Sequence, residues 1–354
     1  MKKIRVAVMG CTGLVGQQFV RLLDGHPYFD LVALTSSSRS AGRPYRQAMQ
    51  WSVGTEVPES AGRIAVLDTN LAAVMSEAPE IVFSALPPAA AESIEGALRE
   101  RGIGVFSNAS ARRMDADVPI LIPEINPGHL DLARRQLGRF GGFIVTNSNC
   151  STSGLALVLK PLDKFGIREV LVTTFQSISG AGRRGLAAMD IAGNVIPWIR
   201  QEEEKMARES RKILGQLDGV NIVLPPFEVH ATCCRVPVRE GHLMSAVIRF
   251  DREVSAEAAT EALASFRGVP QELGLPTAPE RPVIVREEED RPQPVLDVLA
   301  GRPERARGMA VSVGRIRGNS GAISLVLLVH NTVRGAAGTC VLAAELAVSE
   351  KLVN

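Results

Sequence analysis

Residues Ile4–Gly16 read IRVAVMGCTGLVG, and this stretch decides the fold. The first six residues are mostly apolar and predict a buried strand, and apolar residues at helical spacing (Phe19, Val20 and Leu23) follow the glycines. A strand that passes through a glycine-rich turn into a helix is typical of dinucleotide-binding domains. There the backbone approaches a pyrophosphate at the helix N-terminus. The Gly-Lys-Ser/Thr ending of an ATP-binding phosphate loop is absent, which argues against an ATPase.

The next predicted strand, Leu31–Leu34, indicates which dinucleotide binds. It leads into residues 35–43, which hold hydroxyl and arginine side chains where an NAD-binding domain usually has an acidic residue. A carboxylate there would hold the ribose hydroxyls of NAD, whereas hydroxyls and an arginine suit the 2′-phosphate of NADP. The sequence therefore favours NADP, with a polar surface loop as the alternative interpretation.

Strands and helices alternate through the first 149 residues. This pattern predicts an α/β fold in which a Rossmann-type, doubly wound parallel sheet forms a nucleotide domain over residues 1–149. Its expected elements are the strands Ile64–Leu67, Ile81–Ser84, Gly104–Ser107 and Phe143–Thr146 and the helix Ala89–Arg101. From this domain we expect the cofactor to contact Gly10, Thr12, Gly13, Leu14, Val15, Gly16, Ser37, Arg39, Ser40 and Leu86.

Longer strands appear after Lys160 and predict a second, α+β domain over residues 150–330, with an antiparallel or mixed sheet and a helical layer. The segments Leu275–Pro294 and Gly301–Gly308 are rich in proline and arginine and are interpreted as loops. Gly335–Leu352 predicts a closing helix, and residues 331–354 are expected to complete the nucleotide domain. The strands predicted here are Glu169–Ser177, Ala231–Val238, Leu243–Phe250 and Ala322–Val329.

Composition excludes several classes of protein. The chain has 354 residues, of which 45% are hydrophobic and 22% charged, and its net charge of +2 is too small to indicate a nucleic-acid or membrane partner. No apolar run approaches the ~20 residues of a membrane span. Only three residues precede the first strand, which leaves no room for a signal peptide. Five cysteines in no zinc or disulfide spacing predict a cytoplasmic protein without a bound metal.

The stretch Thr146–Gly154, TNSNCSTSG, holds the strongest candidate nucleophile. Cys150 lies between a predicted strand and a predicted helix, with Ser151 or Thr152 as the expected helix cap. A helix N-terminus and a nearby imidazole both favour the thiolate form of a cysteine. The alternative is a small buried cysteine beside a capped helix.

Three further stretches carry polar residues that a packed core does not require. Gln176–Gly182 offers an amide and exposed backbone groups, and Asn108–Arg113 places arginines after a strand, where they could hold an anion. Arg235–His242 places His242 beside a glycine, and we take it as the candidate base. Spacing alone gives His26, His129, His230 and His330 as good a claim.

Taken together, these motifs resemble aspartate-semialdehyde dehydrogenases of the archaeal and fungal branch, from Met1 to the last helix. The matching segments are Gly10–Gly16, Arg39–Gly42, Ser107–Met114, Thr146–Thr152, Gln176–Gly182, Glu202–Lys205, Arg235–His242 and His330–Gly335. Two positions depart from the branch. Ser148 stands where proline is usual, and Cys234, beside Arg235, stands where asparagine is usual.

The resemblance implies a glyceraldehyde-3-phosphate-dehydrogenase-like fold and an NADPH-dependent reduction of L-aspartyl 4-phosphate to L-aspartate 4-semialdehyde and phosphate, in lysine, threonine and methionine biosynthesis. It implies a homodimer or homotetramer and an acyl thioester on Cys150. His242 is then the acid/base and Gln176 orients the intermediate. The implied substrate contacts are Arg113, Asn149, Glu202, Lys205 and Arg235, and further cofactor contacts are Ser179, Gly180 and Asn331.

Two other functions stay open at this stage. A malonyl-CoA reductase of the same fold would keep Cys150, His242 and the NADP site but would bind a thioester in place of an acyl phosphate. A non-catalytic NADP-binding sensor is disfavoured because a nucleophile, a candidate base and a set of anion-binding residues occur together.

Overall fold

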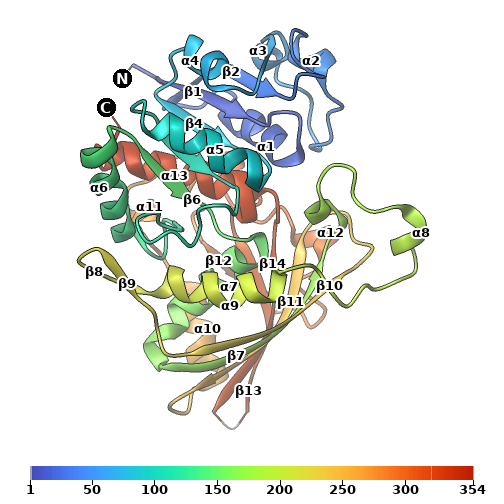
Figure 1. Ribbon diagram of the computed structural model, residues 1–354. Coiled ribbons are helices and arrows are strands. Elements are labelled where there is room, and N and C mark those ends of the chain that lie inside the picture. Colours follow the sequence, from blue (N-terminus) through green and yellow to red (C-terminus); the bar gives the residue numbers. More distant parts are fainter. Residues whose placement is uncertain (1, 320, 354) are drawn as a thin grey trace. The chain divides into compact units, whose positions relative to one another are not determined.

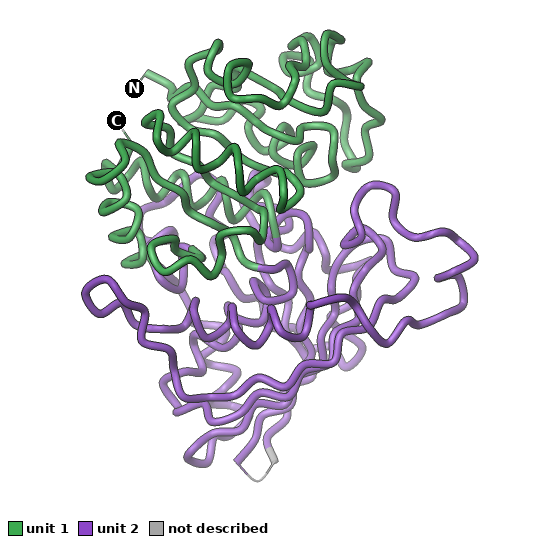
Figure 2. The backbone as a smooth tube through the Cα atoms, viewed as in Figure 1, with its two compact units in different colours: residues 1–121, 127–148, 336–354 green, residues 122–126, 149–335 purple. Residues whose placement is uncertain are grey.

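The computed structural model describes residues 2–319 and 321–353 and divides the chain into two compact units (Figure 2). Unit 1 comprises residues 1–121, 127–148 and 336–354, and unit 2 comprises residues 122–126 and 149–335. Cys150 is the second residue after the boundary between residues 148 and 149. The last residues of the chain belong to unit 1 together with its first residues.

Unit 1 is built on a parallel sheet in the strand order β3-β2-β1-β4-β5-β6. The order reverses direction between β1 and β4, and in doubly wound sheets this switch point is where ligands bind. The elements are β1 (Ile4–Met9), α1 (Leu14–Leu23), β2 (Phe29–Ser36), α2 (Tyr45–Ala48), α3 (Glu59–Gly62), β3 (Val66–Asp68), α4 (Leu71–Ser76), β4 (Ile81–Ser84), α5 (Pro88–Arg99), β5 (Gly104–Ser107), α6 (Leu130–Phe140), β6 (Phe143–Thr146) and α13 (Gly338–Ser349) (Figure 1).

Strands β4, β5 and β6 of unit 1 are buried on both faces. The residues of β4, β5 and β6 are all buried, as expected when helices cover both sides of a parallel sheet. Helix α13 contributes an almost wholly apolar surface, with ten of its residues buried, and contacts α1 and β5. The predicted strands of this unit are present, and β2 runs two residues further at each end than the sequence predicted.

Unit 2 contains a mixed sheet in the order β10-β7-β11-β14-β13-β12. In the central part of this sheet, β7 pairs antiparallel with β11, β11 with β14, and β14 with β13. The outer strands pair parallel, β10 with β7 and β12 with β13. The elements are α7 (Cys150–Leu162), β7 (Ile167–Gln176), α8 (Ala188–Ile191), α9 (Glu202–Leu214), β8 (Gln216–Asp218), β9 (Asn221–Val223), β10 (Glu228–Arg235), β11 (His242–Phe250), α10 (Ala256–Ser265), α11 (Val269–Glu272), β12 (Val283–Val285), α12 (Pro294–Asp297), β13 (Val311–Asn319) and β14 (Ala322–Val329).

Helix α7 forms the centre of the helical layer of unit 2. It contacts α9, α10 and β14, and eleven of its residues are buried. Because this helix is enclosed by its neighbours, its first residue, Cys150, has a position fixed by the packing of the whole unit. The opposite face of the sheet is more open, and Phe175 of β7 is 36% exposed there.

Four sequence predictions need correction. The strand predicted over Ala231–Val238 is β10, which covers Glu228–Arg235. The predicted loop Leu275–Pro294 contains strand β12, and Gly301–Gly308 contains a short 3-10 helix over Glu304–Ala306. The closing helix begins at Gly338, because a π-helical turn over Val333–Ala337 precedes it and Ala336 leaves the helical conformation. Within residues 2–319 and 321–353, none of the helices has the length and apolar character needed to cross a membrane.

Candidate active site

Cys150 is the first residue of α7, and the helix is capped by Asn149. The Asn149 backbone is not helical, and its Oδ1 accepts hydrogen bonds from the N–H groups of Ser151 and Thr152 at 3.0 and 3.3 Å. The prediction that Ser151 or Thr152 caps the helix was wrong, because both lie inside the first turn. The elbow therefore presents Cys150 at the positive end of a well-capped helix dipole.

Two glutamates of α9 accept hydrogen bonds from Asn149 at this elbow. Glu209 is 3% exposed, and its Oε2 accepts the Asn149 backbone N–H at 2.5 Å. Glu202 accepts the Asn149 side-chain amide at 2.8 and 3.0 Å. Glu209 was not among the residues predicted from the sequence, although its place two helical turns after Glu202 puts both carboxylates on one side of α9.

The surroundings of the cysteines distinguish Cys150 from the other four, all of which lie in the described part of the chain. Cys150 is partly exposed, whereas Cys11, Cys233, Cys234 and Cys340 are buried. Burial raises the pKa of the Cys11 thiol to about 12 and that of the Cys233 thiol to about 11. It also raises the pKa of Cys340. These thiols stay protonated at neutral pH, so Cys150 is the strongest candidate nucleophile among the cysteines.

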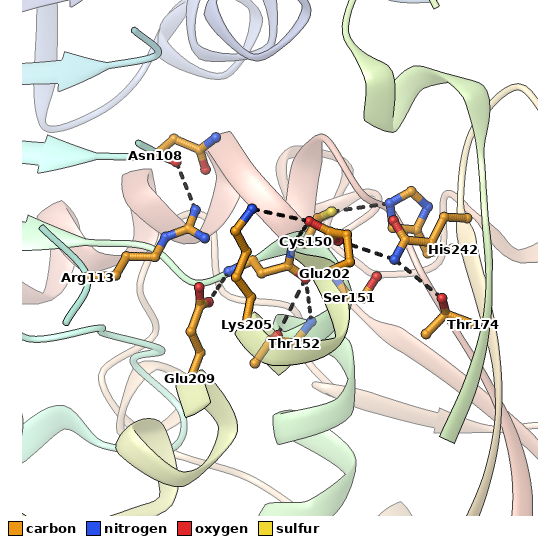
Figure 3. A network of polar contacts seen from close by, with 12 residues as sticks. Asn108, Arg113, Cys150, Ser151, Thr152, Thr174, Glu202, Lys205, Glu209 and His242 are labelled. Carbon is orange, nitrogen blue, oxygen red and sulfur yellow. Dashed lines mark hydrogen bonds and ion pairs between the residues drawn. The ribbon is translucent and has the colours of Figure 1, made fainter. Parts of the chain in front are cut away.

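His242, the first residue of β11, lies against the candidate nucleophile. Its Nε2 is 3.2 Å from Cys150 Sγ, within contact distance for a sulfur hydrogen bond (Figure 3). The ring is fully buried, and burial, reinforced by the positive charge of Arg235, lowers the pKa of His242 to about 3. The imidazole is therefore neutral at physiological pH.

The other four histidines lie in different surroundings. His26 pairs with Glu345 inside unit 1, and His230 lies on the surface within 3.5 Å of Glu169 and Glu228. His129 and His330 are buried. Contact with Cys150 therefore selects His242 from candidates that spacing left equal.

Glu202 connects several of the predicted site residues. Besides Asn149, its carboxylate accepts a hydrogen bond from Gln176 Nε2 at 3.2 Å and lies 3.6 Å from Lys205 Nζ (Figure 3). Gln176 Nε2 also lies 3.3 Å from Thr174 Oγ1. A carboxylate in contact with an ammonium group and two side-chain amides can accept a cationic group of a ligand while its own position stays fixed.

Arg235, at the end of β10, is 7% exposed, and its guanidinium donates to the backbone oxygen of Ser177 at 2.7 Å. Because successive side chains of a strand alternate between faces, Cys233 and Arg235 share one face of β10 and Cys234 the other. Cys234 therefore lies on the side of Phe175, its partner in β7, and not on that of Arg235. The unusual residue at 234 does not face this part of the site.

Two glycines leave space that the site needs. A Cβ on Gly180 would lie 2.5 Å from Arg235 Nη1 and 3.2 Å from His242 Nε2. A Cβ on Gly335 would lie 2.7 Å from Cys150 Cβ and 2.9 Å from its Cα. The contacts with Arg235 Nη1 and with the two Cys150 atoms are shorter than non-bonded carbon and nitrogen atoms tolerate, so a side chain at either position must displace a candidate site residue.

We expect Gly335→Ala to reduce kcat by roughly 10- to 100-fold, because a displacement of Cys150 on the order of 1 Å takes the sulfur out of line with its target. Gly138→Ala is the matched control, because Gly138 lies in helix α6 with no atom near its Cβ position. Steady-state kinetics and thermal unfolding of both variants test the expectation. Wild-type kcat in Gly335→Ala would show that the sulfur position tolerates the displacement.

The predicted cofactor residues of unit 1 surround the turn after β1. A Cβ on Gly16 would lie 2.2 Å from the Gly10 backbone oxygen, and one on Gly10 would lie 2.7 Å from that of Ala85 and 3.5 Å from Leu86. Gly13 caps α1, whose first turn contains Leu14 and Val15. Thr12 Oγ1 hydrogen-bonds Ser36 Oγ at 2.7 Å and thereby joins this turn to the end of β2. The glycines thus allow the tight turn that carries the chain from β1 into the N-terminus of α1, the kind of turn at which a pyrophosphate binds in dinucleotide-binding domains.

The residues after β2 fit the 2′-phosphate of NADP. The strand ends at Ser36, and Ser37 and Arg39 follow with exposed side chains, while Ser40 Oγ donates to the backbone oxygen of Ala48 at 3.3 Å. Residues 35–43 contain no acidic residue. Serine hydroxyls and a guanidinium therefore stand where a carboxylate would repel the extra phosphate.

The remaining predicted residues fall in both units. Arg113 belongs to unit 1, is 6% exposed, and donates to the Asn108 backbone oxygen at 2.9 Å. Asn331 belongs to unit 2 and donates to Ser179 Oγ at 2.8 Å. No group of three or more His, Cys, Asp or Glu side chains suited to a metal ion occurs among residues 2–319 and 321–353.

Comparison with known proteins agrees with this arrangement. The pattern of the family "Semialdehyde dehydrogenase, NAD binding domain" matches residues 5–133, and that of "Semialdehyde dehydrogenase, dimerisation domain" matches residues 159–334. The aspartate-semialdehyde dehydrogenase of Methanothermobacter thermautotrophicus is 47% identical over 97% of this chain and 98% of that protein.

Two further matches bear on the cofactor and the substrate. The crystal structure of the Candida albicans aspartate-semialdehyde dehydrogenase with NADP has a TM-score of 0.90 and 37% identity, and the match covers 99% of this chain and 100% of that one. The malonyl-CoA reductase (NADP) of Metallosphaera sedula is 38% identical over 100% of this chain and 99% of that protein.

Proposed function

The chain belongs to the aspartate-semialdehyde dehydrogenase family, and from this premise we propose that it reduces L-aspartyl 4-phosphate with NADPH to L-aspartate 4-semialdehyde and phosphate. One observation carries the proposal. An accessible cysteine at a capped helix N-terminus lies 3.2 Å from a buried histidine, within a unit that also brings a carboxylate and an arginine to this site. A nucleophile next to fixed groups of opposite charge suits an acyl derivative of an amino acid.

In the proposed first step, the Cys150 thiolate attacks the acyl carbon of the substrate. A C–S bond forms, the C–O bond to phosphate breaks, and phosphate leaves with the bonding electron pair. NADPH, when bound, supplies the hydride that reduces the resulting thioester. The helix dipole stabilises the negative charge on sulfur, and His242 beside it serves as the acid/base group in the steps that follow this attack.

The polar side chains are assigned to the ends of the substrate by charge. Arg235 holds the α-carboxylate, and Glu202, itself positioned by Asn149, holds the amino group. Gln176 orients the carbonyl of the intermediate. Arg113 and Lys205 bind the leaving phosphate, since a dianion is held best by more than one cation. Ser179, Gly180 and Asn331 contribute to the cofactor site from unit 2.

Malonyl-CoA reduction is the second candidate, because a relative with that name aligns over the whole chain. It ranks lower for a chemical reason. The phosphates of coenzyme A lie far from its thioester, so two cations at the reacting carbon would have little use. A non-catalytic sensor ranks lower still, since it would need neither Cys150 nor its contact with His242.

Both directions of the reaction test the substrate assignment. We expect NADP⁺ reduction with aspartate semialdehyde to require inorganic phosphate, and NADPH oxidation to require aspartyl phosphate. If the protein reduced malonyl-CoA, and NADP⁺ reduction did not depend on phosphate, the substrate would be malonyl-CoA and not aspartyl phosphate.

Arg39 is expected to select NADPH over NADH. We expect Arg39→Ala to raise the KM for NADPH about tenfold, the cost of one charged hydrogen bond, and to leave NADH kinetics nearly unchanged. Arg63→Ala, on an exposed arginine of the same unit, is the control. Equal effects on the two cofactors would place Arg39 away from the 2′-phosphate.

The proposed setting is a cytoplasmic homodimer or homotetramer in the biosynthesis of lysine, threonine and methionine. The dimerisation-domain match over residues 159–334 supports association of chains through unit 2. The more open face of its sheet, where Phe175 is exposed, is a suitable contact surface.

A further inference from the structure

A chain of hydrogen bonds leads from Asn331 to the side of the His242 ring that faces away from Cys150. His242 Nδ1 lies 3.0 Å from the Ser177 backbone nitrogen and 3.2 Å from Ser177 Oγ. Ser177 Oγ lies 3.1 Å from Ser179 Oγ, which accepts from Asn331 Nδ2 at 2.8 Å. Asn331 Oδ1 in turn accepts the Gly241 N–H at 3.0 Å. We call Asn331, Ser179 and Ser177 the relay, and all three belong to unit 2.

The direction of each hydrogen bond in the relay follows from its ends. A peptide N–H can only donate, so Gly241 fixes the Asn331 oxygen as an acceptor and turns the Asn331 NH₂ toward Ser179. Ser179 Oγ then accepts from Asn331 and offers its own hydrogen to Ser177 Oγ. Ser177 in turn donates to His242 Nδ1. The Ser177 peptide N–H also points at His242 Nδ1. Because this N–H can only donate, Nδ1 must present a lone pair.

We propose that the relay and the Ser177 peptide N–H hold His242 as the neutral imidazole protonated on Nε2, so that His242 donates a hydrogen bond to Cys150 Sγ and does not accept the thiol proton. The proposal rests on the function assigned above and specifies the acid/base role of His242. Cys150 then loses its proton to water before the substrate binds, and the resulting thiolate accepts the Nε2–H. Ser177 and Ser179 are positioning residues in this account, because they act through His242.

The charged and titratable neighbours of the ring support a neutral donor. Arg235 of β10 and His330, which follows β14, both face His242 and disfavour a second positive charge. The ring and Ser177 are both fully buried, so water does not compete for Nδ1. A tautomer with the proton on Nδ1 would place that N–H against the Ser177 N–H and leave two donors facing each other in a buried site.

Nitrogen-15 NMR of the full chain, labelled at histidine and free of substrate, tests the tautomer directly. The His242 signals are identified by their loss in His242→Gln. Between about pH 6 and pH 8, where free histidine titrates, we expect an unchanging pattern of one protonated nitrogen, Nε2, and one acceptor nitrogen, Nδ1. A proton on Nδ1, or on both nitrogens, in this range would overturn the proposal.

Ser177→Ala tests the hydroxyl part of the relay. We expect the Nδ1 resonance to move toward that of a less hydrogen-bonded acceptor and kcat to fall about tenfold, while the KM for NADPH stays unchanged. Ser265→Ala, on an exposed hydroxyl of α10, controls for a general effect of serine removal. An unchanged Nδ1 chemical shift in Ser177→Ala would show that Ser177 Oγ does not donate to the ring, and it would refute the role of the relay.

The two proposals can fail separately. The NMR experiment uses no substrate, so it reads the tautomer whichever acyl compound the protein reduces. A correct tautomer with no activity on aspartyl phosphate would refute the substrate assignment alone. Activity on aspartyl phosphate with a proton on Nδ1 would refute the relay alone.

Discussion

The Cys150→Ser protein should retain NADP binding and lose nearly all turnover, to below about a thousandth of wild-type kcat, which corresponds to a barrier about 4 kcal/mol higher. A serine hydroxyl without strong base assistance is a far weaker nucleophile than a thiolate. Steady-state kinetics and cofactor titration by fluorescence measure the two properties separately.

The control for this variant is Cys234→Ser. Cys234 belongs to the same unit but is buried, and its side chain lies on the face of β10 opposite to Arg235, so the substitution should leave kcat close to wild type. If Cys150→Ser retained more than about a tenth of wild-type kcat, a barrier change below ~1.4 kcal/mol, covalent catalysis through Cys150 would be excluded.

Lys205→Ala and Arg113→Ala should each reduce kcat/KM for aspartyl phosphate by roughly 10- to 100-fold, because each removes a charged hydrogen bond worth ~1.5–3 kcal/mol to the departing phosphate. The same variants should show a higher KM for phosphate in the reverse direction. Inorganic phosphate should compete with aspartyl phosphate in the wild type and compete less well in both variants.

Arg208→Ala is the matched control for Lys205→Ala, since Arg208 is an exposed cation on the same helix. Its loss should change kcat/KM little, because a solvated surface charge contributes little to binding. Undiminished phosphate competition in Lys205→Ala would place this lysine outside the phosphate site.

The strands of unit 1 could be predicted because their signals are local. The run IRVAVM, the glycine turn and the helix after it occupy neighbouring residues, and each strand of the parallel sheet is a short apolar run. Strand β12 could not be predicted in the same way. Its three residues, Val283–Val285, pair only with Val311–Val313, far along the chain, and proline and arginine surround them in sequence.

The site shows the same division between local and distant causes. The elbow at Cys150 and its cap, Asn149, are local features of the sequence, but the groups that hold Asn149 are not. Asn149 caps the helix while Glu202 and Glu209, 53 and 60 residues later, hold its side chain and its backbone. The contact of Cys150 with His242 spans 92 residues, and sequence spacing left five histidines equal. No role could be predicted for Ser177, because a serine at a strand end has many possible partners and His242 lies 65 residues further along the chain.

The central claim is that Cys150 forms an acyl thioester with the aspartyl group of an acyl phosphate, and intact-mass spectrometry tests it most directly. The wild-type chain is mixed with aspartyl phosphate in the absence of NADPH, quenched in acid, and compared with Cys150→Ser under the same conditions. We predict a gain of one aspartyl group on the wild type, mapped to the peptide that contains Cys150, and no gain on the variant. No adduct on the wild type, or the same adduct on Cys150→Ser, would contradict the account.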